Sequence, residues 1–250
     1  MQLPPAFLER PIAHRALHDT ARGRPENSLA AISAAIQAGY GIEIDLQLSR
    51  DGEAMVFHDY DLSRLTTQTG AVRQHSAAEL GAIQLRHGQE SIPTLAQVLA
   101  LVGGKAPLLV EIKDQDGAMG PNVGTLEAAA ARALSGYIGP VAVMSFNPAS
   151  VAAMARLAPG LPRGLTTCGW DPDDEPLVRE ATRARLRGIP DYDAVGACFI
   201  SHDKSDLGRP RVAELKRACA AVLCWTVRSP EQEVQARKIA QNITFEGYAA

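Results

Sequence analysis

Charged residues interrupt two apolar segments of the chain, and their spacing favours metal chemistry. Glu43 and Asp45 stand two positions apart in one segment, and Glu111 and Lys113 have the same spacing in another. Side chains two apart on a β-strand project from the same face. Acids are seldom buried in strands unless they are paired or bind a metal. Three converging carboxylates would supply the oxygen ligands that Mg²⁺ or Ca²⁺ prefers. The alternative for Glu43 and Asp45 is a structural ion pair with Arg15 or Lys113.

Two histidines could add acid–base chemistry to such a site. His14 closes a short apolar run, and His58 follows Val56-Phe57. A single histidine in either place is more often a structural group, but two histidines beside three carboxylates can supply an acid and a base near neutral pH. The remaining histidines lie in polar segments or beside a strand end and receive no role: His18, His75, His87 and His202.

Short apolar runs alternate with helical sequence along the whole chain. The eight predicted strands are residues 11–14, 41–48, 107–113, 141–146, 161–167, 195–201, 221–227 and 242–246. The predicted helices between them include residues 29–38, 94–101, 125–134, 149–157, 210–220 and 230–240. This alternation predicts an α/β fold, and eight units in 250 residues favour a TIM (β/α)8 barrel. A doubly wound sheet is the alternative, but the Gly-rich turn typical of it is absent from the sequence.

Three segments depart from the regular alternation. Asp51-Gly52 signals a hairpin, and residues 50–92 predict a small insertion after the second strand. Residues 168–194 carry acidic and then basic side chains, which predicts a solvated helix or a lid over 171–187. Only three residues follow Gly247. We therefore expect the final helix to be missing or truncated, and its place to be taken by residues 2–9 or by a partner subunit.

Composition excludes several classes of function. The net charge is −3, from 25 basic and 28 acidic residues, so no basic field favours nucleic acid or an anionic membrane. No apolar run approaches the length of a membrane span, and the first residues lack a signal peptide, so we expect a cytoplasmic protein. None of the four cysteines forms a CxxC pair, which predicts buried thiols in a reducing compartment.

The charged residues belong to longer motifs that resemble the glycerophosphodiester phosphodiesterase family. The motifs are, in chain order, Ala13-His14-Arg15, Pro25-Glu26-Asn27-Ser28, Ile42-Glu43-Ile44-Asp45, Val56-Phe57-His58-Asp59, Glu111-Ile112-Lys113 and Cys224-Trp225-Thr226-Val227. They span nearly the whole chain, and their order and spacing are most specific in its first half.

The resemblance implies one TIM-barrel domain over residues 1–250 that hydrolyses glycerophosphodiesters to glycerol 3-phosphate and an alcohol. The roles that it implies are metal binding by Glu43, Asp45 and Glu111, acid–base catalysis by His14 and His58, phosphate binding by Arg15 and Lys113, and contact with the glycerol or alcohol group by Trp225. The expected cofactor is Mg²⁺ or Ca²⁺, and the expected partner is a small phosphodiester, with an oligomer allowed. We take His14 as the base and His58 as the acid.

Three features of the sequence depart from the family pattern, and they concern specificity more than chemistry. Ala16 stands where the family usually has Gly, and Arg228 where it often has Asn. The last strand reads Ile243-Thr244-Phe245-Glu246-Gly247, where an aspartate-containing version is commoner. Arg228 would add charge at the rim or face solvent. Two alternative functions are a lysophospholipase D-type hydrolase, which needs an apolar groove, and a non-catalytic phosphate-binding relative, which would be expected to have lost one of the acids or histidines.

Overall fold

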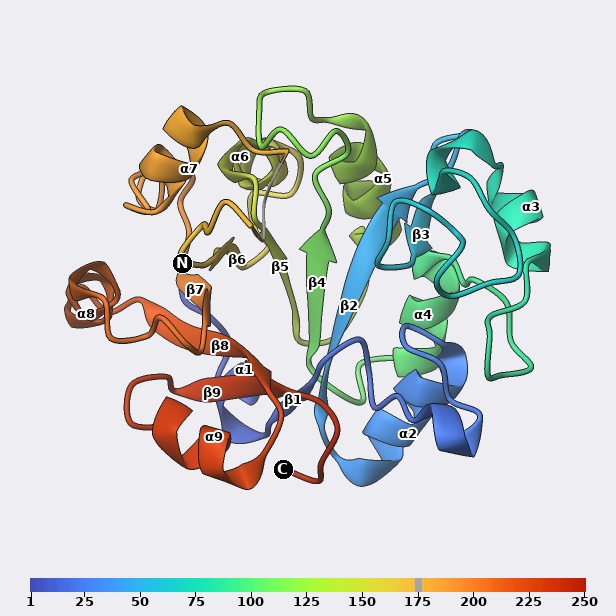
Figure 1. Cartoon of the computed structure of the whole chain (residues 1–250), viewed down its shortest axis with the longest axis horizontal. Helices are drawn as coiled ribbons and strands as arrows, with labels where there is room; N and C mark the ends of the chain where they lie inside the picture. The colour runs from blue at the N-terminus through green and yellow to red at the C-terminus, as the bar shows by residue number, and fades with distance from the viewer. Residues whose placement is uncertain (174–176) are drawn as a thin grey trace.

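Eight parallel strands close into a barrel, as the sequence predicts. The computed structural model describes residues 1–173 and 177–250. The barrel strands are β1 (Ile12–Ala13), β2 (Gly41–Leu48), β4 (Leu108–Ile112), β5 (Val141–Ser145), β6 (Arg163–Thr167), β7 (Phe199–Asp203), β8 (Ala221–Val227) and β9 (Asn242–Phe245). Each strand pairs in parallel with its neighbours, and β1 closes the ring by pairing with both β2 and β9 (Figure 1).

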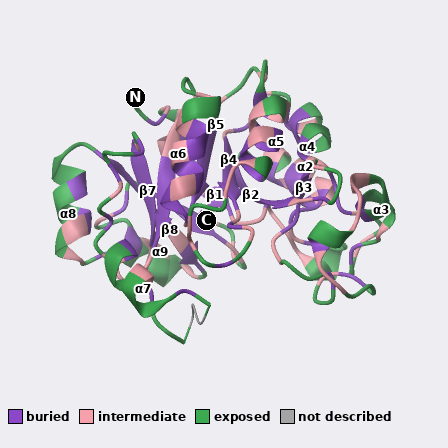
Figure 2. Cartoon of the chain, turned by 90° about the horizontal axis from the view of Figure 1, so that it is seen from above, coloured by how far each residue is buried: buried purple, intermediate pink, exposed green. Residues whose placement is uncertain are grey.

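Helices surround the barrel on its outside. They are α2 (Leu29–Ala38), α4 (Leu95–Val102), α5 (Thr125–Leu134), α6 (Pro148–Leu157), α7 (Glu180–Leu186), α8 (Pro210–Arg217) and α9 (Pro230–Ala236). Ser28 and Asn147 cap α2 and α6 by accepting backbone N–H groups of the first turn. The strands are buried while the helices expose their outer faces (Figure 2). No helix of the described residues is long and apolar enough to cross a membrane.

Side chains inside the barrel form an apolar layer and a charged layer. On β4, Leu108, Val110 and Ile112 pack in the large core cluster, whereas Leu109 joins a separate cluster with Phe199. Glu111 continues the alternation on the same face as Leu109. The amino end of the barrel interior is therefore apolar, and its carboxyl end holds the acids. Catalytic groups of this fold lie at that carboxyl end.

The N-terminal helix closes the amino end of the barrel. In α1 (Ala6–Glu9), Phe7 is fully buried and packs in the cluster that contains Leu109 and Phe199. The Asn242 side chain donates to the backbone oxygens of Phe7 and Arg10, at 2.7 and 2.6 Å. The expectation that residues 2–9 take the place of the final helix is thus wrong, because Phe7 finds its apolar surroundings at the end of the barrel.

Chain ends and aromatic rings cover the outer face of β9. The described residues run to Ala250, and β9 is the last helix or strand among them. The ring of Phe245 packs edge-on against Tyr40 and Tyr248, at centroid distances of 4.8 and 5.5 Å. The Tyr40 hydroxyl donates to the backbone oxygen of Ala250 at 2.8 Å. These contacts join the last described residues to Tyr40, which follows α2.

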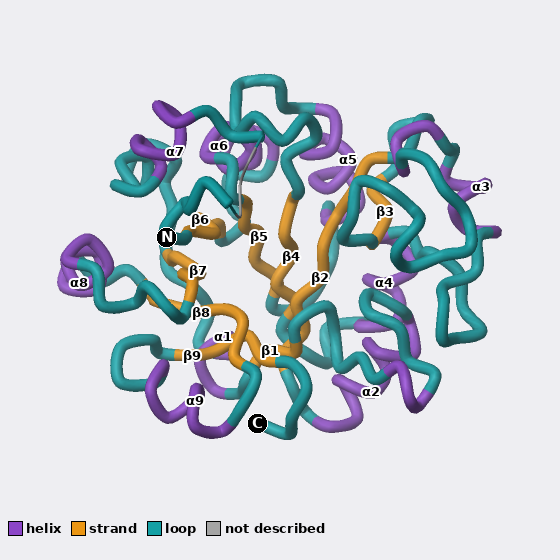
Figure 3. Tube along the Cα trace, viewed as in Figure 1, coloured by secondary structure: helices purple, strands orange, loops and turns teal. Residues whose placement is uncertain are grey.

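The insertion after β2 is a small unit with its own core. It begins with β3 (Ala54–Val56), which is antiparallel to β2, and continues through a 3₁₀ helix at Val72–Gln74 to α3 (Ala77–Ala82). Another 3₁₀ helix, Thr20–Arg22, lies outside the insertion, in the loop after β1. Met55, Phe57 and Leu80 are buried together in it. The insertion extends from the side of the barrel beside β2 (Figure 3).

Two predicted segments differ in detail. The strand expected at 195–201 is Phe199–Asp203, because Gly196 adopts a left-handed conformation (φ 62°) and residues 195–198 form a loop. His202 consequently lies within β7, fully buried, with Nδ1 2.7 Å from Thr167 Oγ1. In the acidic–basic segment the described part contains α7, anchored through buried Leu186. Asp174 and Glu175 of that segment lie outside the described residues.

Replacement of Phe7, which closes the amino end of the barrel, is expected to destabilise the fold. Phe7→Ala removes a fully buried ring from the apolar layer and should lower the free energy of unfolding by ~3–5 kcal/mol. Ile138→Ala is the matched control, since Ile138 is 89 % exposed. Urea denaturation of both variants measures the effect; a loss in Phe7→Ala no larger than in the control would contradict this role.

Candidate active site

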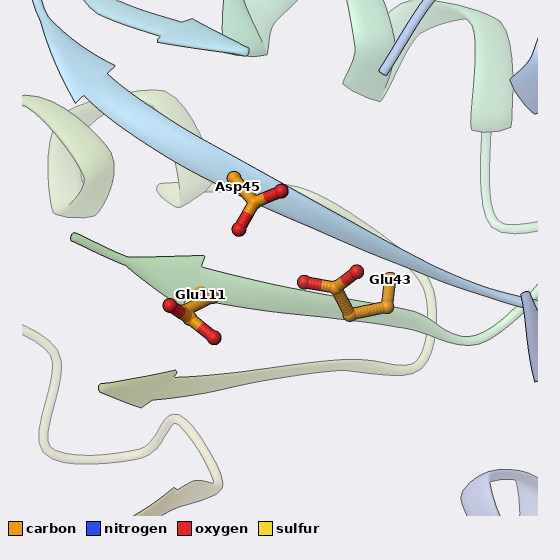
Figure 4. Close-up of side chains that lie close together, drawn as sticks. All are labelled: Glu43, Asp45 and Glu111. Atoms are coloured by element: carbon orange, nitrogen blue, oxygen red, sulfur yellow. The ribbon is translucent and has the colours of Figure 1, made fainter. Parts of the chain in front are cut away.

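Three carboxylates from two neighbouring strands meet inside the carboxyl end of the barrel. Asp45 of β2 is paired in register with Glu111 of β4, and Glu43 lies two residues before Asp45. Glu43, Asp45 and Glu111 offer oxygens that all lie within 4.8 Å of one another, and all three residues are buried. Figure 4 shows the three carboxyl groups pointing toward one another. The convergence expected from the two-residue spacing is therefore present.

Two cations share this carboxylate cluster. Lys113 Nζ lies 2.8 Å from Asp45 Oδ1 and 2.6 Å from Glu111 Oε1. Arg15 Nε lies 3.7 Å from Asp45 Oδ2, and the backbone N–H of Arg15 donates to Glu43 Oε2 at 2.8 Å. Although burial would raise it, the charges of Lys113, His58 and Arg15 hold the pKa of Asp45 far below its usual range.

When fully ionised, the cluster has an unbalanced negative charge. Three carboxylates face the two cations Lys113 and Arg15, and Arg15 is itself shared with Glu26. Burial, together with the charges of Asp45 and Glu111, raises the pKa of Glu43 well above its ordinary value. Ion pairing therefore does not account for the whole cluster. A buried set of oxygen donors with excess negative charge fits a hard divalent cation.

Asn27 orients the central carboxylate. Its side-chain amide donates to Asp45 Oδ2 at 3.0 Å, and its Oδ1 accepts the backbone N–H of Asp45 at 3.3 Å. Asn27 is 1 % exposed and lies at positive φ (59°) just before α2. The loop after β1 is thus held against β2 at the site. Asn27 lies in the motif Pro25-Glu26-Asn27-Ser28, but nothing in the sequence indicated this role.

His58 stands at the start of the insertion, and an ion network fixes it there. Its Nδ1 lies 2.7 Å from Asp59 Oδ1, and Arg64 Nε donates to Asp59 Oδ2 at 2.6 Å. Arg64 also donates to Glu26, which accepts from Arg15 at 2.8 Å. Although burial opposes it, hydrogen bonds from His58 and Arg64 hold the pKa of Asp59 below its usual range. The network links the insertion to the loop after β1.

His14 directly follows β1 and faces the carboxylate of Glu246, the residue after the last barrel strand. Its Nδ1 lies 2.6 Å from Glu246 Oε2, and Arg228 Nε donates to Glu246 Oε1 at 2.7 Å. Burial lowers the pKa of His14 by more than its hydrogen bond with Glu246 raises it. A neutral imidazole is the form that can accept a proton. Arg228 is exposed, in line with one of the two expectations for it, but its ion pair with Glu246 was not expected from the sequence.

A cavity of about 530 Å³ opens beside these groups. Its lining residues include the polar His58, Glu111 and Lys113 and the aromatic Phe146 and Trp225. Phe146 packs edge-on against Trp225 at a centroid distance of 5.4 Å, and the Trp225 indole N–H donates to the backbone oxygen of Ser201 at 3.0 Å. The cavity therefore joins charged groups to an aromatic wall, as expected of a pocket for a polar ligand with a carbon skeleton.

The turn after His14 uses an unusual backbone. Arg15 and Ala16 both have positive φ, 50° and 63°. This conformation favours glycine, so the presence of Ala16 at that position costs some conformational strain. The turn nevertheless keeps the backbone N–H of Arg15 on the Glu43 carboxylate, and the backbone N–H of Ala16 donates to the backbone oxygen of Glu43 at 2.9 Å.

Comparison with known proteins identifies related chains. Residues 14–243 match the model of the glycerophosphoryl diester phosphodiesterase family. A glycerophosphodiester phosphodiesterase of Caldanaerobacter subterraneus subsp. tengcongensis is 34 % identical over 169 residues, which cover 63 % of this chain and 67 % of that protein.

Solved structures share the same architecture. An Oleispira antarctica phosphodiesterase, determined in complex with its product sn-glycerol-3-phosphate, superposes with a TM-score of 0.78 at 25 % identity, covering 96 % of this chain and 94 % of that one. A glycerophosphodiester phosphodiesterase from Parabacteroides distasonis shares the fold with a TM-score of 0.72 at 24 % identity, covering 94 % and 91 %. The chain described here belongs to the glycerophosphoryl diester phosphodiesterase family.

Proposed function

We propose that the chain is a divalent-metal-dependent hydrolase that cleaves glycerophosphodiesters into glycerol 3-phosphate and an alcohol, with residues 1–250 acting as one catalytic domain. The convergence of Glu43, Asp45 and Glu111 beside Lys113 and His58, at the open end of the barrel, carries this proposal. The product complex of the Oleispira antarctica relative supports the substrate class.

Glu43, Asp45 and Glu111 would hold Mg²⁺ or Ca²⁺. Three carboxylates and two cations leave one negative charge, a dication makes the sum +1, and a phosphodiester of charge −1 brings it to zero. When bound, the metal would stabilise negative charge on the phosphate oxygens. The charges of the site are therefore balanced only when metal and substrate are both bound.

Two cations of the chain are placed to bind the phosphate. Arg15 Nε is buried and has no hydrogen-bond partner among the described residues, so it keeps a donor for a phosphate oxygen. Lys113 lies in the wall of the cavity beside Glu111. Burial lowers the pKa of both cations, but nearby carboxylates, above all Asp45, raise it by more. The pKa of each cation is therefore raised, and both stay charged. Fixed positive charge at developing oxyanions is commonly the largest contribution to such catalysis.

The two histidines would move the protons. His14 is the base: its Nε2 takes a proton from the attacking oxygen, which belongs to water or to a neighbouring glycerol hydroxyl, as a new bond to phosphorus forms. His58 is the acid: it gives a proton to the oxygen of the departing alcohol as its bond to phosphorus breaks. If the glycerol hydroxyl attacks, water then opens the cyclic phosphate. Trp225 and Phe146 would contact the carbon skeleton of the substrate in the cavity.

Loss of either histidine should impair turnover far more than binding. His14→Ala and His58→Ala are each expected to lower kcat by ~10²–10⁴-fold, because each removes one proton transfer. The rate of alcohol release from glycerophosphocholine measures this, and His75→Ala serves as the control outside the site. Wild-type kcat in both variants would contradict the mechanism. Faster cleavage of lysophosphatidylcholine than of glycerophosphocholine would favour the lysophospholipase D alternative.

Metal binding should appear in the stability of the protein. A divalent cation at 100-fold its Kd stabilises the folded state by about 2.7 kcal/mol. Glu43→Gln should abolish the increase in Tm that Mg²⁺ or Ca²⁺ gives and, like EDTA, abolish turnover. An equal increase in Tm for wild type and variant would contradict the assignment of the ligands.

The same variant should reveal the buried charge in the metal-free protein. The pKa of Glu43 is raised in the fold, so the unfolded chain loses this proton first as the pH rises above about 4.5. Metal-free wild type should therefore lose stability relative to Glu43→Gln between acid and neutral pH. Unfolding in urea with EDTA at pH 5 and pH 7.5 measures the difference, and a difference that does not change with pH would contradict the prediction.

A further inference from the structure

Glu246 lies between a candidate catalytic histidine and an arginine. Its Oε2 is 2.6 Å from His14 Nδ1, and its Oε1 accepts from Arg228 Nε at 2.7 Å. His18 Nε2 lies 3.6 Å from Oε2, which is beyond hydrogen-bond distance. The Glu246 side chain is 19 % exposed and that of His14 is 13 % exposed, so both are largely withdrawn from water.

Backbone hydrogen bonds fix the relative positions of these residues. The N–H of His14 donates to the oxygen of Phe245 at 2.9 Å, and the N–H of Glu246 donates to the oxygen of Val227 at 3.0 Å. The ends of β1, β9 and β8 thus lie in register, and they present His14, Glu246 and Arg228 side by side. The carboxylate position follows from the barrel closure and does not depend on a mobile loop.

The charge of Glu246 determines where the His14 proton lies. Burial raises the pKa of Glu246, but the hydrogen bond with His14, the nearby imidazole of His18 and the charge of Arg228 together hold this pKa far below its usual range. An ionised carboxylate can only accept hydrogen bonds. His14 Nδ1 must therefore carry the hydrogen in this contact, which leaves the lone pair of a neutral His14 on Nε2.

We propose that Glu246 is a positioning residue that holds His14 with Nδ1–H bound and Nε2 free to accept the substrate proton, and that Arg228 fixes the Glu246 carboxylate. This inference rests on the proposed function, in which His14 is the base. The second histidine has a similar partner, because Asp59 Oδ1 binds His58 Nδ1 and Arg64 donates to both oxygens of Asp59. Glu246 and Arg228, which both lie in segments that depart from the family pattern, thus act as a pair.

Replacement of Glu246 should affect turnover more than substrate binding. In Glu246→Gln the amide can donate to Nδ1, which favours the tautomer with hydrogen on Nε2 and disables the base. We expect kcat to fall by ~100-fold or more with little change in KM. Glu246→Asp keeps the charge with a shorter side chain and should retain part of the activity. Arg228→Gln should cause a smaller loss, and Glu246→Gln/Arg228→Gln should be no worse than Glu246→Gln alone.

Glu233→Gln is a matched control for the loss of a half-buried ion-paired glutamate. Its carboxylate accepts from Arg237 Nε at 2.6 Å and from the Tyr248 hydroxyl at 2.9 Å, and its side chain is 18 % exposed, yet it touches none of the site residues. We expect wild-type kcat for this variant. Tm values of all variants separate unfolding from loss of catalysis.

The tautomer of His14 tests the inference without reliance on a folded variant. In ¹⁵N spectra of histidine-labelled wild type, with the His14 signals assigned by their absence from His14→Ala, the hydrogen should lie on Nδ1. A wild-type hydrogen on Nε2, or wild-type kcat in folded Glu246→Gln, would overturn the proposal. If wild type releases no alcohol from glycerophosphocholine, the proposed function fails. If His14→Ala is fully active, the assignment of His14 as the base fails and the positioning role fails with it. If His14→Ala is inactive while Glu246→Gln is fully active, only the positioning role fails.

Discussion

The repulsion among three buried carboxylates is the constraint on which the rest of the site depends. Glu43, Asp45 and Glu111 share a space in which their oxygens approach within 4.8 Å. Burying like charges together is costly unless cations offset them. Lys113 and Arg15 offset part of this charge, and the raised pKa of Glu43 marks the part that stays uncompensated. The barrel tolerates such a cluster because its apolar layer, closed by Phe7, supplies the hydrophobic burial at the other end.

Two separate parts of the chain complete the site around this cluster. The insertion carries His58, and the chain Asp59–Arg64–Glu26–Arg15 ties it by charged hydrogen bonds to the loop after β1. The closing strand β9 brings Glu246 to His14 on the other side. Each histidine thus keeps Nδ1 on a carboxylate that also binds an arginine. In this arrangement the orientation of each imidazole ring is set by a hydrogen-bonded carboxylate.

Local spacing made much of the fold and the centre of the site predictable from sequence. The alternation of apolar runs and helices predicted the barrel, and the period of two residues on β2 and β4 predicted that Glu43, Asp45 and Glu111 share a face. Cap and turn residues, such as Ser28 before α2, placed helix ends well. These signals succeed because they depend on neighbours a few positions away.

Contacts between residues far apart in the chain could not be predicted from the sequence. His14 and Glu246 are 232 positions apart, and only the closure of β9 onto β1 brings them together. Asn27 reaches Asp45 from a loop whose path depends on positive φ at Arg15 and Ala16. The apolar residues at 195–198 resembled a strand, but the turn at Gly196 delays β7, and this places His202 inside the wall of the barrel.

The identity of the products formed from glycerophosphocholine tests the proposed function most directly. Phosphorus NMR can follow this reaction with Mg²⁺ or Ca²⁺ and with EDTA. We expect the substrate signal to be replaced by that of glycerol 3-phosphate when metal is present and to persist with EDTA. Release of phosphocholine, or cleavage that continues in EDTA, would contradict the proposed function.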